Sequence, residues 1–211
     1  MTVHVQVKDF PASKAIVSNS NKPLSVLLKE KTTTDHESLD RRIMRADPFG
    51  DPGRYQGFLK MQYCFHWMTA PLYHIESLNQ WIPNLSDSCR LEQVIQDCLD
   101  LGITKHQLEE MALKLKPAAV NKVAALGWLY TLEGSNLGAA FLFKHAKAIG
   151  FSATYGAAHL AGHSEGRGRH WRMFKSCLDA IPLNDDDIAM ACAGGQSAFQ
   201  YVRNLVEQHL P

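Results

Sequence analysis

The chain has 211 residues and a near-neutral charge, because 22 Lys and Arg against 21 Asp and Glu leave a formal net charge of +1. Hydrophobic residues make up 45% of the sequence, which is enough to build the core of one ordinary domain. This charge balance lacks the strong positive field with which proteins bind nucleic acid or an anionic membrane surface. We therefore expect neither as the main partner.

The sequence also argues against a membrane span or an export signal. It contains no run of about 18 apolar residues, and its first 21 residues are polar and mixed. Its five cysteines are an odd number with no C-x-x-C pair, as is common in reducing compartments. We expect a soluble, cytoplasmic protein.

The first half of the chain is predicted to be an arm followed by amphipathic helices. Residues 1–22, with a Ser-Asn cluster at 18–21, are typical of a flexible N-terminal arm, so the folded domain is expected to span 23–211. Apolar residues spaced by three and four predict one helix from Leu24 to Ile43 and another from Tyr55 to Leu72. Pro71 is expected to end or kink the second.

The second half continues the helical pattern. A less regular stretch around Pro83 precedes a helix over 91–101 that ends at Gly102, and Thr104 is the expected N-cap of the next helix. A long helical segment over 118–149 is interrupted by glycines, a loop follows over 162–168, and two further helices cover 171–178 and 188–209. Because no period-two alternation and no repeat is found, the predicted fold class is all-α, a single multi-helical domain.

His36 is the first candidate functional residue. The series Leu28, Thr32, His36 and Leu39 places its imidazole on the inward stripe of the first helix. An imidazole there requires a partner, which is either a hydrogen bond within the core or a ligand. The sequence leaves both interpretations open.

A glycine-rich block over residues 133–140 is the second candidate. Gly134 and Gly138 are four residues apart in a helical segment, and each costs about 0.5–1 kcal/mol relative to alanine. They bare the backbone on one face, which permits either close crossing of another helix or contact with a flat ligand. An inward histidine, apolar helices and one bared helix together meet the requirements for holding haem.

Several motifs together resemble the bacterial, biliverdin-producing haem oxygenases. The resemblance extends from about Pro23 to the C-terminus, and the glycine block is its most specific part. The matching segments are KEKTTTDHE at 29–37, FLKMQ at 58–62 with FH at 65–66, GWLY at 127–130, EGSNLGAAFLFKH at 133–145, GRG at 166–168 and HWR at 170–172.

The resemblance implies that haem b is held between a proximal helix and a kinked distal helix. His36 would be the axial metal ligand, and Gly134 and Gly138 would contact the porphyrin. Asp40, one turn after His36, would orient the imidazole through its other nitrogen. Lys29 and Tyr130 occupy the positions that bind the haem propionates in the α-cleaving members, which implies biliverdin IXα as the product.

The implied reaction is oxidative cleavage of haem by O2 and electrons to biliverdin, ferrous iron and CO, for iron acquisition. Haem is both substrate and cofactor, and the electrons come from an external ferredoxin- or flavodoxin-type reductase. According to the resemblance, the candidate catalytic residues are Gly134, Ser135, Asn136, Gly138, Gln62, His66 and His159, and Arg90 and Trp171 are further members of a polar network. Without the resemblance, the polar side chains in this set would be interpreted as packed or capping residues.

Four alternatives or additions remain. His159 and His163 have the spacing of a zinc-ligand pair, without a third ligand at a convincing distance. A basic cluster of Arg167, Arg169, His170 and Arg172 is either a solvated surface or a docking face for an acidic donor. A haem carrier without turnover is the main functional rival, and a helical interaction domain without cofactor is another. We expect a monomer.

Overall fold

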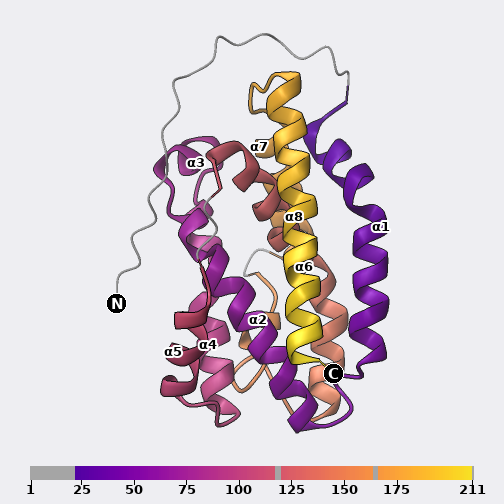
Figure 1. Ribbon diagram of the computed structural model, residues 1–211, viewed down its shortest axis with the longest axis vertical. Helices are drawn as coiled ribbons and strands as arrows, with labels where there is room; N and C mark the ends of the chain where they lie inside the picture. The colour runs from indigo at the N-terminus through magenta and orange to yellow at the C-terminus, as the bar shows by residue number, and fades with distance from the viewer. Residues whose placement is uncertain (1–21, 117–119, 164–165, 211) are drawn as a thin grey trace.

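A computed structural model describes residues 22–116, 120–163 and 166–210 of the chain (Figure 1). Within these residues the secondary structure is helical apart from isolated bridges at Ser152, which confirms the all-α class. Residues 1–21 of the predicted arm lie outside the described residues. The α-helices are α1 Leu24–Arg45, α2 Pro52–Tyr73, α3 Glu76–Trp81, α4 Leu91–Asp100, α5 Lys105–Lys114, α6 Lys122–Ala148, α7 Arg167–Asp179 and α8 Asp185–His209, with short 3-10 helices η1 Leu85–Ser88 and η2 Ala158–Leu160.

Helix α8 is the element around which the others assemble. It packs against α1, α2 and α6, and in Figure 1 it runs through the middle of the molecule with α1 on its right and α2 on its left. The packing is closest at two glycines of α8. A Cβ atom added to Gly194 would collide with the Ala124 carbonyl of α6, and one added to Gly195 would lie 3.3 Å from Leu28 of α1. Glycine therefore lets α8 hold the two helices that carry the candidate site.

Side chains at the helix N-termini fix where several helices start. Asn121 accepts hydrogen bonds from the backbone of Val123 and Ala124 at the start of α6, at 3.0 and 2.8 Å. Thr104 forms a capping box at α5, as the sequence predicts, and Asn184 does the same at α8. Gly102, at φ +80°, follows the end of α4 as expected.

The structure corrects four details of the sequence prediction. Helix α2 continues through Pro71 to Tyr73, because a proline in the last turn removes only one backbone hydrogen bond. The stretch around Pro83 is more regular than expected, since it follows α3 and precedes η1. The predicted loop over 162–168 is too long at its end. Gly166, at φ +87°, is the last residue before α7, so Gly168 already lies within this helix.

Helix α6 is the fourth correction. It is assigned as one helix over 27 residues, including Gly127, Gly134 and Gly138, where the sequence predicts interruptions. Its buried residues, such as Leu129 and Leu132, pack in the core and offset the helix-propensity cost of the glycines. The glycine that serves a helix crossing is Gly127, where a Cβ atom would collide with the Ala191 carbonyl of α8.

Candidate functional site

His36 lies on α1 with its side chain 59% exposed, so the predicted inward position is wrong. Each step of four residues advances about 40° beyond a full turn, which puts His36 about 80° around the helix from Leu28. Thr32 and Leu39 remain buried, whereas His36 stands at the margin of their stripe. Its ring packs edge-on against Phe199 of α8, with the ring centroids 5.9 Å apart.

The imidazole of His36 is oriented by a carboxylate on the same helix. Oδ2 of Asp40 lies 3.3 Å from Nδ1 of His36, one helical turn away, as the sequence suggests. Nδ1 therefore faces the carboxylate, and Nε2 is the nitrogen that can bind a metal ion. A carboxylate on the second nitrogen is the usual arrangement for a metal-binding histidine. Lys29 is exposed on the same side of α1.

One face of α6 combines bare backbone with exposed apolar side chains. Gly138 has open space around it, since a Cβ atom added there would meet nothing within 4 Å. On the same face, the side chains of Leu137 and Phe141 are 44% and 57% exposed. Gly134 differs, because the ring of Trp171 covers it at about van der Waals distance. Neither glycine lies where the backbone of another helix would exclude a Cβ atom, and at Gly138 the backbone is open.

Tyr130 lies one turn before Gly134 and borders the same face. It is buried, and its ring packs against that of Trp171 with centroids 5.2 Å apart. Burial raises the pKa of the Tyr130 phenol, so the hydroxyl stays protonated and can donate a hydrogen bond. The structure therefore places a neutral donor at one end of the exposed face of α6.

A buried carboxylate anchors this part of α6. Glu133 accepts hydrogen bonds from the Tyr73 hydroxyl of α2 and from Asn136, and its Oε2 lies 2.7 Å from Nε2 of His170 on α7. Burial and the Glu133 charge raise the pKa of Tyr73 well above its usual value. The cluster ties three helices together directly beside Gly134.

Asn136 is buried on the opposite side of α6 from Gly134 and Gly138, whereas Ser135 is exposed at the border of their face. The Ser135 hydroxyl donates to the Leu132 carbonyl at 2.7 Å, within the helix. The buried Asn136 side chain donates to Glu133, and the backbone carbonyl of Asn136 accepts from Arg167 at 2.8 Å. Both side chains therefore support α6 in this structure.

Gln62 and His66 lie one turn apart on α2, and the structure buries them to different extents. His66 is buried, whereas Gln62 is half-buried. Burial lowers the pKa of His66 to about 3, with smaller contributions from the positive charges of His159 and Arg90. His66 is therefore neutral at physiological pH and can both donate and accept a hydrogen bond.

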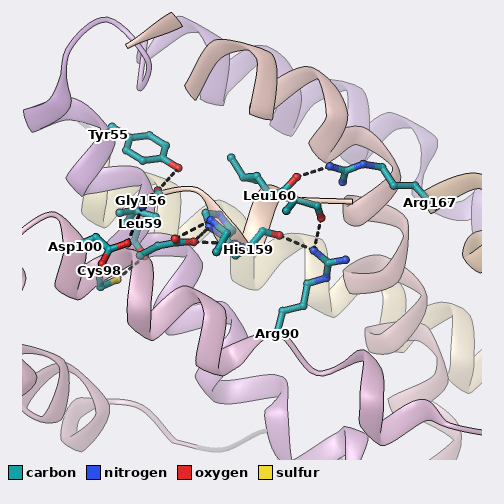
Figure 2. Close-up of polar contacts among 12 residues, drawn as sticks. Tyr55, Leu59, Arg90, Cys98, Asp100, Gly156, His159, Leu160 and Arg167 are labelled. Carbon is teal, nitrogen blue, oxygen red and sulfur yellow. Dashed lines mark hydrogen bonds and ion pairs between the residues drawn. The ribbon is translucent and has the colours of Figure 1, made fainter. Parts of the chain in front are cut away.

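His159 lies in η2, where charged side chains hold the backbone in place (Figure 2). Arg90 donates to the His159 and Ala161 carbonyls at 2.8 and 2.7 Å, and Arg167 donates to the Leu160 carbonyl. His159 itself is buried against Asp97. The chain from His159 to His163 is not an α-helix, and no group of three metal-ligating side chains occurs among the described residues, so the zinc alternative has no support.

These residues fit haem. The exposed His36 ring, held at Nδ1, can ligate iron, and the open face at Gly138 can receive a flat apolar ring beside Phe141. Lys29 supplies a cation for a carboxylate. Helices α1 and α6, which carry these residues, contact each other and share α8 as a neighbour.

Comparisons with known proteins agree with this fit. A family model described as "Heme oxygenase" matches residues 22–208. "Heme oxygenase PigA" of Pseudomonas aeruginosa is 35% identical over 177 residues, covering 84% of this chain and 88% of that protein. Among solved structures, the NO- and CO-bound heme oxygenase of Neisseria meningitidis matches with a TM-score of 0.83 and 37% identity, over 89% of this chain and 92% of that one.

A second structure extends the likeness in fold alone. The heme oxygenase of Leptospira interrogans matches with a TM-score of 0.73 at 15% identity, over 89% of this chain and 100% of that chain. The chain belongs to the haem oxygenase family. It is a haem-degrading oxygenase, and haem is its substrate and partner. Among the described residues, no helix has the length and apolarity of a membrane span.

Sequence reasoning missed the residues that hold the site in place. Glu133 carried a signal, since a carboxylate between Leu132 and Gly134 in an apolar helical segment has to be buried and paired. Asp97 carried none, because it reads as the polar face of α4, and its partner His159 is 62 residues away. The sequence likewise contains no signal that Tyr73 binds Glu133.

Proposed function

We propose that this chain cleaves haem to biliverdin, ferrous iron and CO, with His36 as the axial ligand and the face of α6 at Gly134 and Gly138 as the distal wall. The observation that carries the proposal is the open backbone at Gly138 beside exposed apolar side chains. Bound haem supplies the iron at which O2 is activated and the ring that is oxidised. The protein's part is to bind, orient and move protons.

Each side of the site has a separate task. Asp40 holds Nδ1 of His36, so that the ring presents Nε2 to iron. Gly138 itself offers no side chain, and its surroundings are open, so this position would supply no ligand to haem iron. The neutral residues His66 and Gln62, with His159, are proposed to hold water and pass protons, because they are buried or half-buried and able to both donate and accept. Ser135 and Asn136 act through α6, as their contacts suggest.

The product isomer is proposed to be biliverdin IXα. Lys29 and Tyr130 would bind the two haem propionates, one through a point charge and the other through a neutral hydroxyl. Chromatography of the product tests this orientation. The wild type is expected to give mainly the α isomer, and a Lys29→Ala, Tyr130→Phe double variant a mixture. Mainly β or δ isomer from the wild type would contradict the assignment.

Electrons are proposed to come from a ferredoxin- or flavodoxin-type reductase that docks on α7. Of the predicted basic cluster, Arg167 and His170 are bound to α6, whereas Arg172 is exposed. Lys175 adds a further cation, 5.6 Å over the ring of Trp171, the side chain that covers Gly134. Such a basic face suits an acidic donor. Donor-supported turnover should fall as salt rises, whereas ascorbate-supported turnover should not. Equal salt dependence of both rates would exclude the docking face.

The cellular setting completes the proposal. A cytoplasmic monomer, with the folded domain over 23–211, would release haem iron for the cell. Light scattering of the purified chain tests the oligomeric state. Growth of a deletion strain with haem as the sole iron source tests the purpose, since loss of growth is expected and normal growth would contradict it.

One experiment separates the oxygenase from a haem carrier. Haemin is added to the purified protein, followed by O2 with ascorbate, while the haem absorption band is recorded. The proposal predicts loss of the band with biliverdin and free iron appearing. A haem complex that survives reductant and O2 would instead identify a carrier.

A further inference from the structure

Asp97 on α4 is a fully buried carboxylate that binds one segment of the chain with both oxygens. Oδ1 accepts from the backbone N–H of Ala158 at 2.7 Å, and Oδ2 accepts from the backbone N–H of His159 at 2.8 Å. Oδ2 also lies 2.6 Å from Nδ1 of the His159 ring. Within the described parts of the chain, all the hydrogen-bond contacts of the Asp97 carboxylate are therefore with η2.

These contacts determine which ring nitrogen of His159 carries the fixed proton. An ionised carboxylate only accepts hydrogen bonds, so the short contact requires a proton on Nδ1. In the neutral ring Nε2 then carries no proton and is the nitrogen that can accept and release one. It is buried, and no hydrogen-bond partner reaches it from the described parts of the chain. A buried polar atom left in this way is a position where a ligand or ordered water is expected.

The ring has little freedom to move. Arg90 binds the carbonyl of His159 itself, and Arg167 binds that of the next residue. On the α2 side, the ring lies against Phe58, with centroids 6.1 Å apart. The charged or titratable groups around the His159–Asp97 pair include Arg90 at α4, His66 on α2 and Arg167 on α7, with Tyr55 and Cys98 beside Asp97.

We propose that Asp97 is the positioning residue that fixes His159 as the Nδ1–H tautomer and so makes its Nε2 the proton-exchanging atom of the site. The proposal rests on the proposed function, in which His159 passes protons on the distal side. A proton enters and leaves at Nε2, while the Nδ1 proton stays in its hydrogen bond to the Asp97 carboxylate. The Asp97 carboxylate stabilises the His159 ring while both of its nitrogens carry protons, as in other carboxylate–histidine pairs.

The first test uses nitrogen-15 NMR of the histidine rings in the haem-free protein, which needs no turnover. The wild type is expected to show His159 with a proton held on Nδ1, and the Asp97→Asn variant is expected to lose that state. Asp100→Asn is the matched control, because Asp100 binds Gly156 N–H at 2.8 Å in the same segment without contacting His159. A wild-type ring protonated only on Nε2 overturns the proposal, even if Asp97→Asn fails to fold.

The second test measures haem loss in a single turnover as a function of pH. Asp97→Asn should slow it by at least about tenfold and change the pH profile, since acid–base groups contribute about 10²–10⁴ to such rates. Asp100→Asn should keep the wild-type profile. Identical profiles in all three proteins overturn the positioning role while leaving the oxygenase intact. A wild type that does not consume haem contradicts the proposed function instead.

Discussion

Replacing Gly138 with alanine should stabilise the haem-free protein and impair the enzyme. Glycine in a helix costs about 0.5–1 kcal/mol relative to alanine, and a methyl group at Gly138 meets no atom within 4 Å. For a chain of this size the gain corresponds to a rise in Tm of about 1–4 °C. If the haem ring lies against the backbone at Gly138, the added methyl group displaces the haem ring by about one C–C bond length. Such a shift can lower the rate about tenfold to hundredfold.

The assay compares thermal unfolding of haem-free protein with single-turnover haem loss. Gly127→Ala is the matched control, because it adds the same methyl group to the same helix where backbone atoms of α8 leave no room. Overpacking of this kind costs about 1–3 kcal/mol, so the control should be less stable. A Gly138→Ala protein that is destabilised, or that consumes haem at the wild-type rate, would refute the reasoning.

Two further predictions concern stability. The pKa of His66 is lowered to about 3 in the folded protein, so the unfolded chain binds the extra proton first and stability is lost as pH falls below about 6.5. Below about pH 6.5 the free energy of unfolding of the wild type should fall by up to about 1.4 kcal/mol per pH unit, as measured by urea titrations. His66→Gln should reduce this pH dependence, and an equal pH dependence in both proteins would contradict the effect of burial on His66. Asp179 on α7 accepts hydrogen bonds from the backbone N–H and the hydroxyl of Ser25 at 2.7 and 2.8 Å. Asp179→Ala is therefore expected to lower the free energy of unfolding by about 1–2 kcal/mol, and Asp179→Asn by less. An unchanged free energy of unfolding in Asp179→Ala would show that the hydrogen bonds to Ser25 are not formed in solution.

Most of the helical framework could be predicted from the sequence, since apolar spacing and cap residues are local signals. Thr104 and Gly102 mark helix ends where the structure has them. The glycines could not be interpreted in the same way. Gly127 serves the crossing of α6 and α8 and Gly138 does not, a difference that depends on which helix lies opposite.

The candidate site shows the same division. The residue pattern and then the family resemblance both pointed to His36 and the glycine block as candidates. Periodicity nevertheless placed His36 inside the core, because the apolar stripe was treated as running straight along the helix. The polar contacts that hold the site, from Asp97 to His159 and from Tyr73 to Glu133, join residues 62 and 60 positions apart. Such pairs arise only when the helices pack.

His36 is proposed to bind the iron of the haem that is then degraded. The most direct test records the absorption and electron paramagnetic resonance spectra of the ferric complex in wild type and His36→Ala, before and after imidazole is added. The account predicts a histidine-ligated spectrum in the wild type, its loss in His36→Ala, and its return with imidazole because the free ring occupies the same place. A His36→Ala complex with the wild-type spectrum and undiminished haem loss would contradict the account.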